Sequence, residues 1–238
     1  MLEYVGLFFA AFFAAAISGV AGFGGALLLL PLVAATVGVQ KGVPLLTVVQ
    51  LLGNLSRAGF GFKQIKWKPV GLFLLGGVPF CILGAFSFVE LPKEIVTRVI
   101  GAIILLAVAL QYFGEFKFKA GPKVLIAGGA VVGLISGMVG SSGPISAAIF
   151  LTLKLKPVAY IASDATTSLV MHALKTAVYQ HYIDFDREFW ILAAVMGIAV
   201  IAGTWVGKKI VENMPQKKFQ WLVGILLVLN ALYMLIHG

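Results

Sequence analysis

Two apolar stretches of this chain carry polar and charged side chains at helical spacing. Residues 43–62 contain Thr47, Gln50, Asn54 and Arg57, and residues 158–182 contain Asp164, Thr167, Ser168, His172 and Lys175. Intervals of three and four residues predict one polar stripe on each helix. An ionised side chain at the centre of a membrane helix costs ~2.5 to 3.5 kcal/mol on insertion scales, so both stripes are expected to face the protein interior or water.

The two stripes superimpose at an offset of 118 residues: Gln50 on Ser168, Asn54 on His172, and Arg57 on Lys175. This pairing places one cation on each helix. Arg57 can bind an anion through bidentate contacts to planar or tetrahedral oxygens, and Lys175 can act as a point charge. The competing interpretation is that both long side chains extend to the headgroups and bind nothing.

Asp164 and His172 are the candidates for proton coupling, which stays an open hypothesis. Asp164 fits an ion-pair partner, a proton carrier or a first-turn residue favoured by the helix dipole. His172 has an intrinsic pKa suited to proton exchange, although a hydrogen-bonded role also accounts for it. The histidines lack metal-ligand spacing, so neither a metal site nor another cofactor is expected.

Each stripe follows an apolar segment that is interrupted by small residues. The first interruption comprises Gly22, Phe23, Gly24 and Gly25, and the second comprises Gly140, Ser141, Ser142 and Gly143. Helix breaks surrounded by lipid would leave backbone groups unsatisfied, so both are expected to line something polar. Their backbone amides and the serine hydroxyls are expected to receive the anion. The alternative is that the small residues only allow close helix packing.

Composition indicates an integral membrane protein. Of 238 residues, 61% are hydrophobic and 11% charged, and the mean hydropathy is +1.04, whereas soluble domains contain about 25% charged residues. The net charge of +9 lies mainly in short connectors, which favours a lipid bilayer over nucleic acid as the partner. The single Cys81 excludes a disulfide framework within the chain. Residues 2–16 lack the basic start of a signal peptide and are expected to be retained.

The apolar runs predict an all-helical membrane fold built from two repeats, residues 1–119 and 120–238. The runs are 2–38, 43–62, 70–89, 95–113, 121–153, 158–182, 189–207 and 219–236. About 20 residues span the hydrocarbon layer, so the first and fifth runs are too long for one crossing and are expected to break and return. Each repeat then has a broken or re-entrant first helix and three transmembrane helices, giving about eight helical segments, or ten if both breaks are full hairpins.

The distribution of basic residues predicts the orientation in the membrane. If both long runs return, one side holds twelve lysines in the connectors 63–69, 114–123, 153–157 and 208–218, and the other keeps Lys41, Lys93 and Arg187. The positive-inside rule then places the lysine-rich side in the cytoplasm and both termini outside. An odd number of passes per half inverts the second repeat relative to the first, as in many secondary transporters.

Part of the first repeat resembles a known family. Gly22-Phe23-Gly24-Gly25 is followed by Pro31, by Asn54 and Arg57, and by Phe62-Lys63 before Ile65-Lys66-Trp67. This pattern is similar to the sulfite exporter TauE/SafE family of membrane permeases, and the likeness extends over both halves. The resemblance implies export of small sulfur-containing anions, such as sulfite or organosulfonates, across a bacterial or archaeal inner membrane. The second half departs from the pattern at Ser141, Ser142 and Pro144, and the hydroxyls would add donors to the site.

We therefore expect a secondary transporter that exports a small anion by alternating access through a site between the two breaks. Two alternatives stay open: a passive anion channel on the same scaffold, and a membrane subunit that only scaffolds a partner. An enzyme is the weaker hypothesis, because the chain shows no nucleophile with a base and no paired catalytic carboxylates. The number of subunits is undetermined from the sequence, with a homodimer as one option.

Overall fold

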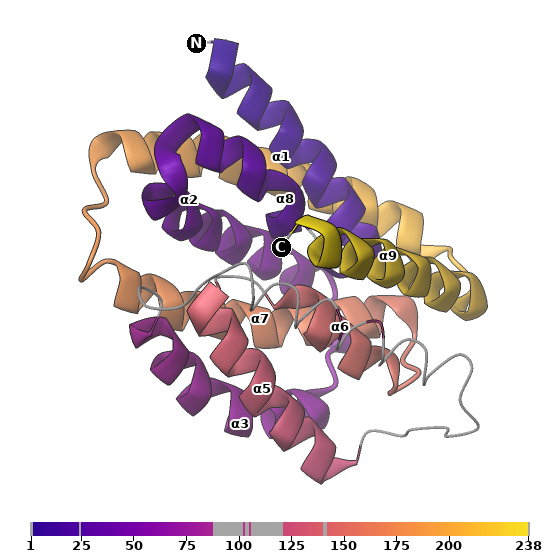
Figure 1. Cartoon of the computed structure of the whole chain (residues 1–238). Coiled ribbons are helices and arrows are strands. Elements are labelled where there is room, and N and C mark those ends of the chain that lie inside the picture. Colours follow the sequence, from indigo (N-terminus) through magenta and orange to yellow (C-terminus); the bar gives the residue numbers. More distant parts are fainter. Residues whose placement is uncertain are drawn as a thin grey trace.

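The computed structural model describes residues 2–23, 25–87, 102, 105, 121–139 and 142–237. Its elements are α1 (Leu2–Ala21), α2 (Gly25–Phe60), the short 3-10 helix η1 (Phe62–Gln64), α3 (Trp67–Phe86), α5 (Pro122–Val139), α6 (Gly143–Leu151), α7 (Pro157–Tyr179), α8 (Arg187–Glu212) and α9 (Gln216–His237) (Figure 1). No strand occurs among these residues, so the all-helical class is confirmed. The predicted run 95–113 lies outside the described residues except for 102 and 105.

Three of the described helices are long and apolar enough to cross a membrane. The candidate spans are Tyr4–Ala21, Trp67–Phe86 and Arg187–Glu212. Large apolar side chains are exposed along each of them, for example Phe9, Leu75 and Ile198. In water such surfaces would be an aggregation liability, whereas a bilayer solvates them. The outer faces of these helices therefore fit a lipid environment.

Helix interruptions coincide with the glycine-rich segments. Helix α1 ends at Ala21 and α2 begins at Gly25, while α5 ends at Val139 and α6 begins at Gly143. A further kink occurs within α2 at Gly38, whose φ of 76° and ψ of 160° are not helical. This kink falls between the apolar runs predicted to end at residue 38 and to begin at residue 43. Each first helix is thus followed by a short helical piece before the polar stripe begins.

Each first helix packs against a helix of the other half of the chain. Helix α1 lies along α8, and α5 lies beside α3 (Figure 1), while α2 contacts both α7 and α8. A Cβ on Gly19 would lie 3.3 Å from Gly207 Cα, and one on Gly137 would lie 2.5 Å from Ala85 N. Glycine at these positions lets two backbones touch, as small residues do in membrane helix pairs.

Polar side chains link separate segments of the chain at two places. In the first, Lys41 Nζ donates to Asp186 Oδ2 at 2.7 Å, and the hydroxyl of Tyr4 donates to Glu188 at 3.3 Å. The hydrogen bond from Lys41 lowers the pKa of Asp186, so this pair stays ionised near neutral pH. In the second group, Gln216 Nε2 donates to the carbonyl of Lys154 at 2.7 Å. The connector before α7 therefore touches the start of α9.

Gly137→Ala is expected to destabilise the fold by ~1 to 3 kcal/mol, the usual cost of overpacking. The added Cβ would meet backbone atoms of Ala85 and Cys81, which cannot move without separating α3 from α5. The matched control is Gly71→Ala on α3, because nothing lies within 4 Å of its added Cβ. This control should be neutral, or stabilising by up to ~1 kcal/mol. Thermal unfolding in detergent measures both, and equal midpoints would contradict the close packing of α3 on α5.

Candidate functional site

A polar cavity lies between the two helix interruptions and contains about 500 Å³ of empty space, part of it open to solvent. Both halves of the chain form its walls, through α2, α5, α6, α7 and the segment after α1. The lining residues are Gly22, Phe23, Gly25, Ala26, Gln50, Asn54, Arg57, Val132, Ser136, Ser142, Gly143, Ser146, Thr167, Ser168, Met171 and His172. The two polar stripes therefore converge on one space.

Most residues of the predicted binding set line this cavity. Among the described members of that set, Lys175 is the exception. Gly24, Gly140 and Ser141 were also predicted to bind the anion, and they lie outside the described residues. Asp164, a candidate for proton coupling, is buried on α7 but does not line the cavity. Lys175 and Asp164 therefore act on the cavity only through other residues or through their charge.

Arg57 joins the cavity to the end of α1. Its side chain is only 6% exposed, and its Nη1 donates to the carbonyls of Ser18 at 3.1 Å and Gly22 at 2.9 Å. Its Nη2 donates to Asn54 Oδ1 at 2.7 Å. These carbonyls belong to the negative end of the α1 dipole, which a cation stabilises. The guanidinium is thus held inside the protein and does not extend to the headgroups.

One nitrogen of this guanidinium makes no hydrogen bond within the described part of the chain. Arg57 Nε is buried and has no hydrogen-bond partner among the described residues. The Nδ1 atom of His172, which lines the same cavity, is also buried without a partner there. Buried polar groups in native proteins are nearly always hydrogen-bonded, and each exception requires an explanation. An oxyanion in the cavity would supply the acceptor that Arg57 Nε lacks.

Lys175 occupies the equivalent position in the second half. It is fully buried, and its Nζ donates to the hydroxyl of Ser136 at 3.0 Å. Ser136 lines the cavity, so Lys175 lies directly behind the wall. In both halves the cation contacts the serine 39 positions earlier, Ser18 for Arg57 and Ser136 for Lys175. In each half, the cation of the polar stripe is therefore hydrogen-bonded to a residue near the end of the first helix.

The glycines at the breaks are required by conformation and by space. Gly22 has φ +88°, and a Cβ there would lie 2.8 Å from the Tyr160 ring. A Cβ on Gly25 would lie 3.0 Å from both Gln50 Nε2 and Ser18 Oγ. Only glycine avoids strain at the first position and crowding at both. The backbone can therefore approach the cavity closely at this break.

Five lining residues were absent from the predicted set: Ala26, Val132, Ser136, Ser146 and Met171. Two of them, Ser146 and Ser136, could have been predicted from their positions in the sequence. Ser146 lies one helical turn after Ser142 and hence on the same face of α6. Ser136 matches Ser18 at the repeat offset. The three apolar residues could not be distinguished from ordinary packing residues by type or spacing.

The fold and the cavity define an all-helical integral membrane protein with an internal cationic site. The profile of the sulfite exporter TauE/SafE family matches residues 7–234, and this chain belongs to that family, which confirms the resemblance found in the sequence. The chain is also 24% identical over 213 residues to the probable inner membrane transporter protein TsaS of Comamonas testosteroni, covering 83% of this chain and 84% of that protein. No solved structure matches the chain significantly. Family membership identifies a membrane transporter.

Gly22→Ala is expected to destabilise the protein more than Gly38→Ala does. Both positions have positive φ, and sparsely populated backbone conformations of this kind cost a non-glycine residue ~1 to 3 kcal/mol. Only at Gly22 would the new Cβ also meet a neighbour, the Tyr160 ring, which adds an overpacking cost of ~1 to 3 kcal/mol. Thermal unfolding of both variants measures the difference. In combination with Tyr160→Ala, the Gly22→Ala penalty should shrink, and strict additivity would contradict the contact.

Proposed function

We propose that this protein is a secondary transporter that exports small sulfur-containing anions, sulfite or an organosulfonate, across the inner membrane by alternating access. The observation that carries the proposal is the buried Arg57 with its unpartnered Nε, held between two interrupted helices on the wall of the central cavity. Membership in the sulfite exporter TauE/SafE family supports the substrate class. The name of the Comamonas testosteroni relative supports transport at the inner membrane.

Anion recognition would combine charge with short-range donors. Arg57 Nε offers a charge-assisted hydrogen bond, and the hydroxyls of Ser142 and Ser168 lie on the same walls. The hydroxyl of Thr167 also lines the cavity but already donates to the carbonyl of Asp164 at 2.8 Å. Ser142 is the N-cap of α6 but makes no side-chain capping bond. Within the first turn of α6, Pro144 has no N–H and the amides of Ile145 and Ser146 donate to the Ser142 carbonyl, so the backbone amide left for the anion at this helix N-terminus is that of Gly143. This set of donors suits a pyramidal or tetrahedral oxyanion better than a planar aromatic ligand.

The membrane potential is sufficient to drive export. Expelling one negative charge from a cell that is negative inside gains ~2.3 kcal/mol per 100 mV, so the proposed cycle requires no coupled ion. Lys175 behind Ser136 would add long-range attraction without contacting the anion. Proton coupling through Asp164 or His172 is a secondary proposal, favoured by the unpartnered Oδ1 of Asp164 and Nδ1 of His172.

The proposed architecture is a pair of inverted repeats, residues 1–119 and 120–238. Corresponding contacts in the two halves support it. The first helix of each half packs against the helix that follows the polar stripe of the other half. Helix α1 packs on α8, which follows α7, and α5 packs on α3, which follows α2. In both pairs glycines meet at the crossing, Gly19 with Gly207 and Gly137 with Gly84. Inverted repeats place the two breaks on opposite sides of a common site.

The proposed orientation has the lysine-rich connectors in the cytoplasm and both termini outside. Contact between Gln216 and Lys154 supports the grouping of two such connectors on one side. The ion pair between Lys41 and Asp186 supports the grouping of the opposite connectors. The excess of lysine on the first side then sets the direction through the positive-inside rule.

Cysteine labelling tests this orientation. In a Cys81→Ser background, Lys41→Cys should react with an impermeant thiol reagent only from the outside, and Lys66→Cys only from the cytoplasm. Both residues are exposed, so access is limited by the membrane and not by burial. Permeabilised membranes, in which both variants should react, provide the control. Reaction of both from the same compartment in sealed membranes would refute the proposed topology.

Flux of labelled sulfite in proteoliposomes tests the function. Arg57→Ala should raise the KM for the anion roughly ten- to hundred-fold, because a hydrogen bond to a charged group contributes ~1.5 to 3 kcal/mol. Arg57→Lys should recover only part of the affinity, since an ammonium cannot reproduce the fixed fork of donors. Arg187→Ala at the exposed start of α8 is the matched control and should transport normally.

Three outcomes would contradict the proposal in different ways. Wild-type liposomes that move no anion would favour the scaffold alternative. Unitary currents with turnover far above that of a carrier would favour a channel. Unchanged KM in both Arg57 variants would refute the site, provided that thermal unfolding shows both variants to be folded.

A further inference from the structure

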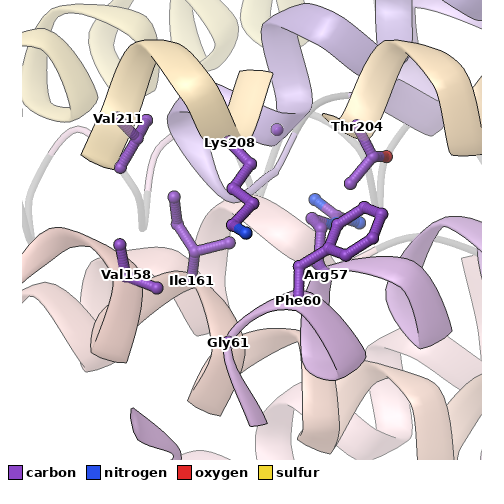
Figure 2. Close-up of a pocket in the computed structure, with 9 residues that line it drawn as sticks. Arg57, Phe60, Gly61, Val158, Ile161, Thr204, Lys208 and Val211 are labelled. Carbon is purple, nitrogen blue, oxygen red and sulfur yellow. The ribbon is translucent and has the colours of Figure 1, made fainter. Parts of the chain in front are cut away.

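A second cavity adjoins Arg57 between the end of α1, where Gly19 lines it, and α2, α7 and α8 (Figure 2). It holds about 290 Å³ of empty space, part of it open to solvent. Most of its walls are apolar, with Phe60 from α2 and Ile161 from α7 among them. Arg57 lines both this cavity and the central one. This buried side chain is thus part of the walls of both spaces.

Lys208 is the other cation in this second cavity. Figure 2 shows its side chain extending from α8 into the space between Ile161 and Phe60. Its Nζ lies 5.4 Å from the centre of the Phe60 ring and 3.2 Å from Glu212 Oε1. The Lys208 side chain is 30% exposed and that of Glu212 is 44% exposed. Such a half-exposed pair contributes little to stability, so Lys208 can exchange Glu212 for another anion at small cost.

The lysine-rich connectors next to the second cavity favour the attraction of anions into it. The cavity is lined by Gly61, which precedes the lysine-bearing segment 63–68, and by Val158, which follows the segment 154–156. Clefts with low-dielectric walls and charge of one sign concentrate counter-ions from solution. Beyond Lys208, the next cation on the path is Arg57, whose Nε has no partner among the described residues.

We propose that this second cavity is an access site in which Lys208 receives a small oxyanion on the lysine-rich face and delivers it to Arg57. The inference rests on the proposed transport function and adds a residue and a location to it. The ligand class is the same, a small anion with oxygen acceptors. Lys208 acts before the central cavity, so it governs capture from one side of the membrane.

The neighbouring Lys209 provides a matched control. It carries the same charge on the next residue of α8, but its Nζ lies 3.7 Å from the centre of the Trp205 ring, and it does not line the cavity. Removal of either lysine changes the positive charge of the connector equally. Only removal of Lys208 changes the charge within the cavity. A comparison of Lys208→Gln with Lys209→Gln therefore separates a local site from general surface charge.

Directional sulfite flux in proteoliposomes of known orientation tests the access site. With sulfite presented on the lysine-rich face, Lys208→Gln should raise KM about five-fold and leave kcat unchanged. With sulfite on the opposite face, its KM should equal that of the wild type while kcat falls about five-fold, because without a driving force kcat/KM changes by the same factor in both directions. Lys209→Gln should match the wild type in both directions. Equal KM values for Lys208→Gln and Lys209→Gln on the lysine-rich face would overturn the proposal.

A second measurement does not depend on transport. In a Cys81→Ser background, Val158→Cys places a thiol on the cavity wall, where it can react with methanethiosulfonate reagents of either charge. The anionic reagent should react faster than the cationic one, and Lys208→Gln should lower this rate ratio about five-fold, whereas Lys209→Gln should not. An unchanged ratio with normal wild-type flux would refute the access site alone. A lowered ratio in a protein that moves no anion would support the access site and refute export.

Discussion

The guanidinium of Arg57 lies where α1 ends, and the site depends on this contact. A helix that stops inside a membrane protein leaves carbonyl groups that lipid cannot satisfy. Nη1 of Arg57 binds the carbonyl of Gly22 beyond the end of α1 and also that of Ser18, which accepts from the Gly22 amide as well. Conversely, a buried guanidinium is tolerable only where acceptors surround it. The break and the cation therefore stabilise each other, and removal of either leaves the other uncompensated.

The second half contains a related contact of a different kind. Lys175 binds the hydroxyl of Ser136, whereas Arg57 binds backbone carbonyls of the first break. A lysine offers three rotatable donors on a flexible stem, while an arginine holds five donors in a rigid fork. Arg57 can therefore fix the backbone and still direct Nε elsewhere. The first-half cation thus lines the central cavity, whereas the second-half cation lies behind its wall.

Periodicity and glycine content predicted the all-helical class and most of the residues that line the central cavity. The stripes became α2 and α7, which pack on each other, so residues such as Gln50 and Ser168 meet in one space. A stripe must face away from lipid, and only one interior is available to both stripes. Because of this constraint, residues that were predicted separately on each stripe line the same cavity, although the sequence pattern contains no information on contacts between distant segments.

Other features could not be predicted because they depend on tertiary contacts. The donors of Arg57 were expected to face an anion, yet three of its contacts are to the protein itself. From the sequence, Lys208 was one of the twelve lysines that predicted the orientation in the membrane. Its position on the wall of the second cavity results from the packing of α8 on α2.

The position of Arg57 on two cavity walls bears on the choice between carrier and channel. A channel requires a continuous polar path, which lowers the cost of an ion at every step. Here the second cavity is largely apolar and meets the central cavity at a side chain that is anchored to the end of α1. Passage of an anion would require these anchoring contacts to rearrange. Under the proposed mechanism, movement of the α1 break would then open one cavity to the site at a time, which is the behaviour expected of a carrier.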